Sequence, residues 1–446
     1  MIPKKKHLYI PIELKNRELD SQVILASEAC KNGYRVYIGT HAAIYSLLRS
    51  KRSKGGIFLD KGTQRKQLTE WIRSKCEAIY ILDQELGPSV EDTATPHEEN
   101  FISNRFYPGT IEMIDGFFCV GPVIFDAASA AFGSQEIVHK SGWPRIDIQQ
   151  KFADKIYADQ IQELKKNHGQ FLLFISDFGL LHPLDQMRDA DRVETLLHAM
   201  PRENWDKTYR DFETTVRILI AWDKDPDVPK IIVRPHINED IRIWQKSLSG
   251  LTKTFVIHKG EITPWISASS GVIHRGSTVA IQAKLMNKAV FYIKEAATAH
   301  ERPRIEKFSD FVVSAVKPPL GNVQKGSQST DIKTLFNEVI YADAGTASAR
   351  MIDVLNQEET ELETRISRTK VFLSYLTPRA LRRLLGLTRD EFAWLIGSSS
   401  RQPQRKNIPH GIRQKDLRVG LKVDLQAEQI QTRFIGINLW ELDLNE

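Results

Sequence analysis

The sequence is poor in cysteine and contains no long apolar run. Only three of its 446 residues are cysteines and none stands in a C-x-x-C pair, which argues against a disulfide framework and against a zinc site. The most apolar window, residues 116–132, is interrupted by Pro122 and Asp126, so it predicts a buried segment and not a membrane span. The apolar stretch near the N-terminus is too short for a signal-peptide core. We therefore expect a protein of the cytoplasm, or of the cytoplasmic face of a membrane.

Glycine-rich phosphate-binding signatures are also missing. The sequence has no G-x-x-x-x-G-K-[ST] motif and no G-x-G-x-x-G motif, so it supports neither a P-loop NTPase nor a classical NAD-dependent enzyme. Its composition is otherwise ordinary. With 41% hydrophobic and 26% charged residues, it is not a disordered, collagen-like or low-complexity chain. A chain of this length is expected to form two or three domains.

Charge is unevenly distributed along the chain. Residues 365–422 contain fourteen Lys and Arg against three acidic residues, a local net charge of +11, whereas the whole chain carries +6 and the remainder therefore −5. Within this basic segment, residues 377–396 place leucine, phenylalanine and tryptophan between arginines. The pattern is typical of a helix on an anionic membrane surface, and equally of a C-terminal helix that packs back on the protein. Both interpretations remain open, and no nucleic-acid partner is expected.

Short apolar runs alternate with helical patterns along most of the chain. Strands separated by helices imply βαβ units and parallel sheets. In the first part we predict helices over 19–32 and 41–48 and buried strands over 7–12, 34–39, 57–59, 78–82 and 116–120. In the second part we predict helices over 211–222 and 279–286 and strands over 171–175, 230–233, 254–257, 271–273 and 289–293.

The predicted fold class is α/β, with two Rossmann-like doubly wound domains that face a cleft and a basic helical C-terminal segment. The N-terminal domain is expected to span residues 1–150, the second domain 151–360 and the C-terminal extension 361–446. In doubly wound sheets, ligands bind at the carboxyl ends of the strands. The residues that directly follow each predicted strand are therefore the candidates for a functional site.

The strongest candidate follows the strand at 271–273. There His274 and Arg275 lead through Gly276, Ser277 and Thr278 into a helix. Ser277 or Thr278 can cap this helix, whose free backbone N–H groups favour an anion such as a phosphate. Arg275 adds a fixed positive charge with bidentate geometry. We expect a phosphate or nucleotide site here, with a plain capped helix that binds nothing as the alternative.

Two other strand ends of the second domain carry polar residues. Arg234 and His236, on either side of a proline, follow the strand at 230–233 and suit the phosphate of a donor. Asp177 follows the strand at 171–175, where a carboxylate can act as nucleophile or electrostatic stabiliser, or can simply cap the next turn. No pair of aspartates suited to hold a cation stands at these strand ends, so no metal is expected.

Charged residues also follow two strands of the first domain. Glu13, Lys15 and Arg17 come after the first strand, where they belong to a binding site or only to the polar start of a helix. Asp83 and Glu85 come after the strand at 78–82, and one of them can be the base that activates an acceptor hydroxyl.

Together these segments resemble GT-B glycosyltransferases. The similarity lies in the two Rossmann-like halves, in Arg-Pro-His after one strand, and in the Gly-Ser-Thr turn before an Ile-Gln-Ala helix. The opening residues 10–20 (Ile-Pro-Ile-Glu-Leu-Lys-Asn-Arg-Glu-Leu-Asp) and residues 31–36 (Lys-Asn-Gly-Tyr-Arg-Val) are more narrowly similar to bacterial surface-carbohydrate biosynthesis proteins. That group includes the retaining β-Kdo transferases, which use CMP-β-Kdo. The resemblance spans roughly residues 7–300.

The resemblance implies a role for each candidate residue. Asp177 matches the acid that acts as nucleophile in a double displacement, and Glu85 would be the acceptor base. The chain has Asp-Gln-Glu-Leu-Gly over residues 83–87, where the family pattern is Asp-Glu-Glu-Gly. The acceptor side would include Glu13, Lys15 and Arg17. The donor side, where the cytidine phosphate and the sugar carboxylate would bind, would consist of Arg234, His236, His274, Arg275, Gly276, Ser277 and Thr278.

The implied activity is transfer of Kdo, or a related ulosonic acid, from a CMP-activated donor with retention. The acceptor would be a glycan or lipid-linked glycan of O-antigen or capsule biosynthesis, and no cofactor is implied beyond the donor itself. Two alternatives stay open: the same fold with a CDP-glycerol-type or UDP-sugar donor, and a non-catalytic scaffold of polysaccharide assembly.

Overall fold

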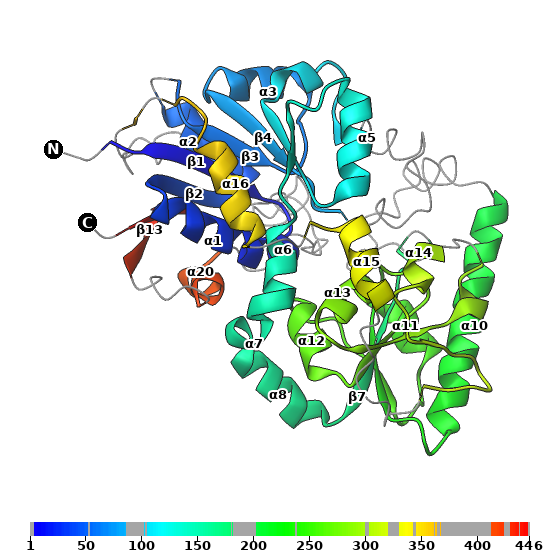
Figure 1. Ribbon diagram of the computed structural model, residues 1–446. Coiled ribbons are helices and arrows are strands. Elements are labelled where there is room, and N and C mark those ends of the chain that lie inside the picture. Colours follow the sequence, from blue (N-terminus) through cyan, green and yellow to red (C-terminus); the bar gives the residue numbers. More distant parts are fainter. Residues whose placement is uncertain are drawn as a thin grey trace, which may run out of the picture. The chain divides into compact units, whose positions relative to one another are not determined.

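A computed structural model describes residues 4–51, 54–85, 102, 105–179, 181, 202–236, 239–298, 303–319, 330–341, 345–360, 362–363, 366, 412–422, 429–436 and 438–444. The chain forms two compact units (Figure 1). The first consists of Met1–Ser89, Thr93–Ile148 and Phe336–Glu446, and the second of Val90–Asp92 and Gln149–Leu335.

The C-terminal part of the chain belongs to the first unit. The backbone N–H of Tyr341 donates to the Val120 carbonyl at 2.8 Å, and that of Ala347 donates to the Asp147 carboxylate at 2.7 Å. The unit boundary near residue 148 lies close to the predicted one at 150. The predicted ranges 151–360 and 361–446 differ from the structure, because residues from Phe336 onward pack on the first unit.

The sheet of the first unit has eight strands in the order β13-β14-β2-β1-β3-β4-β5-β6. Its six parallel strands are β1 (Lys6–Ile12), β2 (Tyr34–Thr40), β3 (Ile57–Asp60), β4 (Ala78–Leu82), β5 (Gly116–Cys119) and β6 (Val138–Lys140). Every residue of β2, β3, β4 and β5 is buried, as expected for parallel strands covered on both faces. Its helices include α1 (Lys15–Lys31), α2 (His41–Ser50), α3 (Lys66–Arg73), α5 (Pro122–Phe132), α6 (Pro144–Asp147), α16 (Ala347–Leu355) and α20 (Gln414–Leu421).

Two C-terminal strands extend this sheet. β13 (Ile430–Gly436) and β14 (Leu439–Leu444) form an antiparallel pair, and β14 runs antiparallel to β2. The sequence analysis predicted neither strand, and the C-terminal segment is therefore not purely helical. The predicted helix over 377–396 lies outside the described residues.

The second unit has a six-stranded parallel sheet in the order β12-β11-β10-β7-β8-β9. Counted along the chain this is the Rossmann order. The strands are β7 (Phe171–Ile175), β8 (Lys230–Arg234), β9 (Thr254–Val256), β10 (Gly271–His274), β11 (Ala289–Tyr292) and β12 (Phe311–Val312). The helices include α7 (Ala153–Ile156), α8 (Ala158–His168), α10 (Arg202–Lys224), α11 (Ile241–Ser247), α12 (Thr263–Ala268), α13 (Val279–Leu285) and α14 (Pro303–Glu306). α15 (Thr330–Val339) contains the boundary between the two units, which falls after Leu335.

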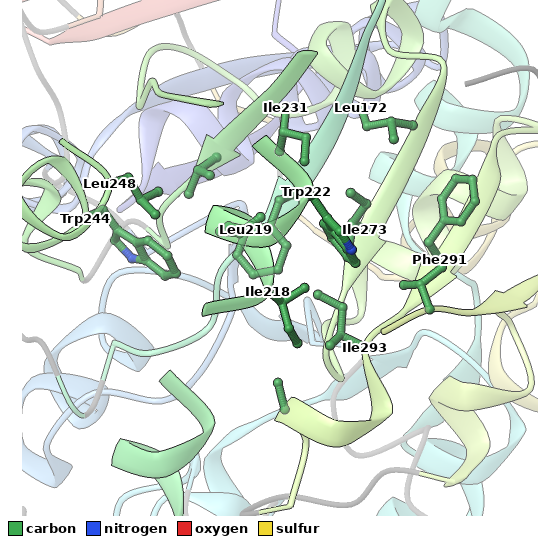
Figure 2. Packing of buried hydrophobic residues seen from close by; sticks show 14 of the residues in the cluster. Leu172, Ile218, Leu219, Trp222, Ile231, Trp244, Leu248, Ile273, Phe291 and Ile293 are labelled. Carbon is green, nitrogen blue, oxygen red and sulfur yellow. The ribbon is translucent and has the colours of Figure 1, made fainter. Parts of the chain in front are cut away.

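The core of the second unit joins its sheet to its helices. Figure 2 shows Ile218, Leu219 and Trp222 of α10 among side chains of the strands, with Trp244 of α11 nearby. Burial of each large apolar side chain contributes about 1.5–3 kcal/mol. The Trp244 indole N–H also donates to Glu239 at 2.6 Å, so this core fixes a carboxylate close to the strand ends.

The predicted fold class is confirmed: the chain is α/β, with two doubly wound units built on largely parallel sheets. The window 116–132 is the buried strand β5 followed by α5, as predicted. Of the helices described, none combines the length and the apolar character needed to cross a membrane.

Candidate active site

The switch point of the second sheet lies between β7 and β10. The chain leaves these neighbouring strands toward opposite sides of the sheet, and ligands of doubly wound sheets bind at the carboxyl ends of the strands at such a point. β7 ends before Asp177 and β10 ends before Arg275. The Arg275 Nε donates to the Asp177 Oδ1 at 2.5 Å. Two residues that the sequence assigned to separate motifs therefore form one ion pair.

Arg275 is committed to this pair and to its surroundings. Its side chain is 1% exposed, and its Nη1 donates to the Asp211 carboxylate at 3.1 Å and to the Ala296 carbonyl at 2.8 Å. The guanidinium lies 4.0 Å from the centre of the Phe178 ring. With two carboxylate partners, Arg275 orients Asp177, and its predicted contact with a donor phosphate stays a prediction.

Asp177 keeps one oxygen available. Its side chain is 28% exposed, and only Oδ1 is engaged by Arg275. Within the described ranges no group hydrogen-bonds to its Oδ2. An oriented carboxylate with one unengaged oxygen at a switch point is suited to act on a bound ligand.

His274 shapes the turn after β10. The imidazole is buried, and burial lowers the pKa of His274 to about 3, so the ring is neutral. Its Nδ1 accepts the Gly276 N–H at 3.1 Å, which leaves Nε2 to donate to the Ser309 hydroxyl at 2.9 Å. Gly276 has a φ of 140°, which favours glycine. His274 thus holds the turn and, contrary to prediction, has no ring nitrogen left for a donor.

The N-cap position of the following helix is Thr278, one of the two predicted candidates. The Ser277 hydroxyl accepts the Val279 N–H at 3.3 Å, whereas the Thr278 side chain makes no cap hydrogen bond to α13. The turn therefore starts the helix as the sequence predicted.

Arg234 is also engaged by the protein. Its guanidinium donates to the carbonyls of Lys259 and Gly260 at 2.6 and 3.0 Å and lies over the Trp265 ring. Burial lowers the pKa of Arg234 to about 10. Arg234 therefore fixes the loop that follows β9, and its predicted contact with a donor phosphate stays a prediction.

His236 differs from the other predicted cations because it is exposed. It lies near His258, which the sequence analysis missed and which follows β9. Burial, and then the charges of Arg234 and His236, lower the pKa of His258 to about 4. His258 directly follows the predicted strand over 254–257, and this position at a strand end was the signal that could have found it.

A buried glutamate ties the ends of β7 and β8 together. Glu239 accepts the Ser176 hydroxyl at 2.6 and 2.8 Å, the Phe178 N–H at 2.8 Å and the His236 N–H at 3.1 Å. Burial raises the pKa of Glu239 to about 7. Because Ser176 and Phe178 flank Asp177, this carboxylate fixes the backbone of the candidate nucleophile. No strand directly precedes Glu239 in the sequence, so strand-end reasoning did not find it.

The first unit has its own pocket at the carboxyl ends of its strands, with a volume of about 340 Å³. It draws on the ends of β1, β2, β3 and β4, next to the switch point between β1 and β3. The lining residues are Glu13, His41, Asp60, Lys61, Gly62, Thr63, Gln64, Gln84, Glu85, Arg105 and Tyr107.

The predicted acceptor-side residues differ in whether they line this pocket. Glu13 lines it and pairs with Lys61 at 2.5 Å. Arg17 pairs at 2.7 Å with Glu85, which also lines it. Lys15 pairs at 2.7 Å with Asp416 of α20 and is not among the lining residues.

The two acids after β4 have different environments. Burial opposes ionisation of Glu85, but the charges of Arg17, Arg105 and Lys61 outweigh it and lower the pKa of Glu85, which makes it a weak base. Burial raises the pKa of Asp83, which is held by Arg105. Glu85 is thus poorly suited to take a proton from a hydroxyl, whereas Asp83 is fully buried and is not among the residues that line the pocket.

A His–Asp pair in the same pocket was missed. His41 begins α2 directly after β2, and Asp60 is the last residue of β3. His41 was taken as the first residue of the predicted helix over 41–48. Asp60 directly follows the predicted strand over 57–59, so its place at a strand end was the signal that could have found the pair.

Comparison with known proteins identifies no family. No family model matches the chain, and no curated protein matches it. Solved structures with some similarity include the wall teichoic acid polymerase TagF with CDPG (13% identity, 80% of this chain and 89% of that chain, TM-score 0.47). Others are UDP-GlcNAc 2-epimerase from Methanocaldococcus jannaschii (12%, 79% and 100%, TM-score 0.47) and its counterpart from Rickettsia bellii (15%, 80% and 97%, TM-score 0.49). At this level of similarity, the function has to be argued from the residues of the chain itself.

Proposed function

We propose that the protein is a GT-B-type glycosyltransferase of surface polysaccharide biosynthesis, for O-antigen or capsule. It transfers Kdo, or a related ulosonic acid, from a CMP-activated donor to a glycan or lipid-linked glycan. The observation that carries the proposal is the Asp177–Arg275 pair at the switch point of a Rossmann-order sheet. The resemblance of the strand-end segments to retaining β-Kdo transferases supports the choice of donor.

In this proposal Asp177 is the nucleophile. Its free oxygen attacks the anomeric carbon of the donor while the bond to the CMP oxygen breaks, and CMP leaves with the electron pair. The acceptor oxygen then attacks the same carbon from the opposite face and displaces Asp177, so two inversions give retention. Arg275 and Glu239 hold Asp177 in place during both steps.

The donor phosphate would bind beside the exposed His236 and the backbone of Gly276, Ser277 and Thr278. Among the predicted cations, His236 is the exposed one, whereas Arg234 and Arg275 are buried and engaged. A CMP donor carries a single phosphate, and we propose that its binding needs no divalent metal. Transfer should therefore survive EDTA, and loss of activity with chelator would contradict this part of the proposal.

A donor panel tests the proposal. The protein is incubated with CMP-Kdo, CDP-glycerol and UDP-sugars, with and without glycan acceptors, and nucleotide release and transfer product are measured. Among these donors, we expect only CMP-Kdo to be cleaved. It should release CMP and, with the acceptor present, give a product whose linkage retains the donor configuration. Turnover of CDP-glycerol or a UDP-sugar instead would favour the corresponding alternative donor, and failure to bind CMP, CDP and UDP by calorimetry would favour a scaffold.

A further inference from the structure

The second unit has a polar pocket at the amino edge of its sheet, with a volume of about 360 Å³. Residues shortly before β10 and β11 line it, together with residues of α7, α8 and the π-helical turn η3 (Ile148–Phe152). α12, which precedes β10, packs against α7 and α8 (Figure 1). Every lining residue belongs to the second unit. Since Asp177 and Arg275 follow the carboxyl ends of β7 and β10, this pocket lies at the opposite edge of the sheet from the candidate active site.

The fold fixes one positive charge in the wall of this pocket. α13 ends in a Schellman motif, in which Asn287 has a φ of 55° and the Lys288 N–H donates to the Ala283 carbonyl at 2.9 Å. The Lys288 Nζ then donates to the carbonyls of Ser267 and Ser269 at 2.7 and 2.8 Å, at the end of α12. Carbonyl groups carry no net charge, so these two bonds orient the ammonium group without cancelling its charge.

The lining as a whole is positively charged. Three lysines and one acidic residue contribute side chains, a net charge of +2 (Lys151, Lys165, Lys288 and Asp154). Lys151 lies on η3 and Lys165 on α8, and both are exposed. Ammonium groups are strong hydrogen-bond donors to phosphate oxygens. Three of them around one small volume favour a ligand that carries a phosphate group.

Two other lining residues supply acceptors. Gln149 is 3% exposed, and its Nε2 donates to Gln282 at 2.7 Å, whereas within the described ranges its Oε1 accepts no hydrogen bond. A buried acceptor without a donor is costly, so a ligand hydroxyl that reaches Oε1 gains a favourable contact. Asp154 accepts a hydrogen bond from the Ser267 hydroxyl at 3.5 Å, and an ionised carboxylate can accept several. Because Asp154 repels a phosphate, this side of the pocket suits hydroxyl groups.

We propose that this pocket binds a phosphorylated monosaccharide as a second ligand of the protein. The phosphate lies among the ammonium groups of Lys151, Lys165 and Lys288, and sugar hydroxyls donate to Asp154 and Gln149. The volume is near the lower end for ligand pockets, which fits a sugar phosphate better than a nucleotide sugar. The inference does not rest on the proposed function, because it uses no residue of the candidate active site.

The first experiment measures which part of the ligand is bound. Glucose 6-phosphate and ribose 5-phosphate are titrated calorimetrically into the full chain at low salt, with glucose, ribose and inorganic phosphate as matched controls. We expect at least one sugar phosphate to bind about tenfold or more tightly than inorganic phosphate or its parent sugar, and more weakly at high salt. Binding of neither sugar phosphate overturns the proposal. Inorganic phosphate or a parent sugar that binds as tightly overturns the choice of a sugar phosphate.

Paired lysine variants test the place of binding. Lys151→Gln combined with Lys165→Gln removes two charges from the pocket. The control, Lys155→Gln combined with Lys166→Gln, removes two exposed lysines of α7 and α8 that do not line it. We expect the first pair to weaken binding about tenfold or more and the control to bind as wild type. An equal loss in both would mean a general charge effect and would overturn the site.

Met286 reports on the pocket directly. It lines the pocket, and it is one of only six methionines in the chain, so selective ¹³C-methyl labelling gives few resonances. Variants to leucine assign Met286 and, as a control in the first unit, Met351 on α16. The tighter sugar phosphate should shift the Met286 methyl resonance and leave that of Met351 in place. A bound ligand that leaves Met286 unshifted lies elsewhere and overturns the proposal. Asp177→Asn should show the same Met286 shift, so this result is independent of any sugar transfer.

Discussion

The histidine and arginines at the strand ends of the second unit have different tasks. Arg234 and Arg275 are buried and hydrogen-bonded to the protein, whereas His236 is exposed near His258. Residue type and strand position predicted all three as donor ligands. Neither shows which partners the fold supplies, so the sequence did not predict that Arg234 and Arg275 are buried and hydrogen-bonded. The carbonyls of residues 259 and 260 and the Asp211 carboxylate come from segments far along the chain.

His236→Ala should therefore weaken nucleotide binding without unfolding the protein. Loss of a charge-assisted contact costs about 1–3 kcal/mol, or roughly 5- to 150-fold in the dissociation constant for CMP. Calorimetric titration measures this, with His168→Ala at the end of α8 as control. Unchanged CMP affinity would remove His236 from the donor site.

A second prediction at the scale of single residues concerns the stability of a Glu239→Gln variant. Glu239→Gln places an amide N–H group against the Trp244 and backbone N–H donors that the carboxylate now accepts. A buried donor left without an acceptor costs about 1–3 kcal/mol of unfolding free energy. Urea unfolding measures the loss, and the exposed Glu213→Gln on α10 is the control.

The pH dependence of this effect has a definite sign. The pKa of Glu239 is raised from 4.5 to about 7 in the folded protein, so the unfolded chain loses its proton first as pH rises. Its contribution to stability therefore falls between about pH 4.5 and pH 7. Glu239→Gln should remove this fall, so the variant should lose more stability relative to wild type at pH 4.5 than at pH 8. An equal loss at both values would contradict the raised pKa.

At the scale of elements, the strands and helices of the two α/β units were largely predictable. Buried parallel strands such as β4 and β7 are continuous apolar runs, and their predicted ends match the structure residue for residue. β6, β12, β13 and β14 were missed. β12 has only two residues, and β14 alternates apolar with charged residues and pairs with β2, some 400 positions earlier in the chain. Short strands whose partners lie far along the chain leave little local pattern.

The strand β14 supplies the partner of a buried arginine. Arg35 on β2 is fully buried, and its Nε donates to Asp443 at 2.8 Å, while Lys5 pairs with the same carboxylate at 2.6 Å. Asp443→Asn would leave Arg35 buried without a counter-charge and should cost about 3–5 kcal/mol. Urea unfolding tests this against the exposed Glu136→Gln, and a loss as small as that of the control would contradict the structural role of the pair.

Acid should weaken the same contact. Burial opposes ionisation of Asp443, but hydrogen bonds and charges from Lys5 and Arg35 outweigh it, so its folded pKa lies below 3.8. Its contribution to stability is then present above about pH 3.8 and is lost as pH falls through the folded pKa. The Asp443→Asn variant should not show this loss of stability at acid pH.

At the scale of the whole molecule, the end of the C-terminal part belongs to the first unit, whereas the basic segment before it is known from the sequence alone. Residues 412–422 and 429–444 include α20, β13 and β14, which belong to the first unit. The helix predicted over 377–396, which would lie on an anionic membrane surface or pack back on the protein, falls outside the described residues, and membrane binding stays a prediction. Flotation with anionic vesicles at low salt tests it, since each Lys or Arg near the surface contributes roughly 1 kcal/mol. Binding should disappear when the arginines of 377–396 are replaced, and absence of wild-type binding would refute it.

The central claim concerns Asp177 and is tested most directly by intact-protein mass spectrometry with donor alone. Wild type incubated with CMP-Kdo should release CMP and gain one Kdo mass on the peptide that contains Asp177. Asp177→Asn keeps an oxygen for Arg275, so it should bind CMP nearly as wild type, form no adduct and lose several orders of magnitude in turnover. Near-normal turnover of Asp177→Asn, or an adduct on another carboxylate, would contradict the account.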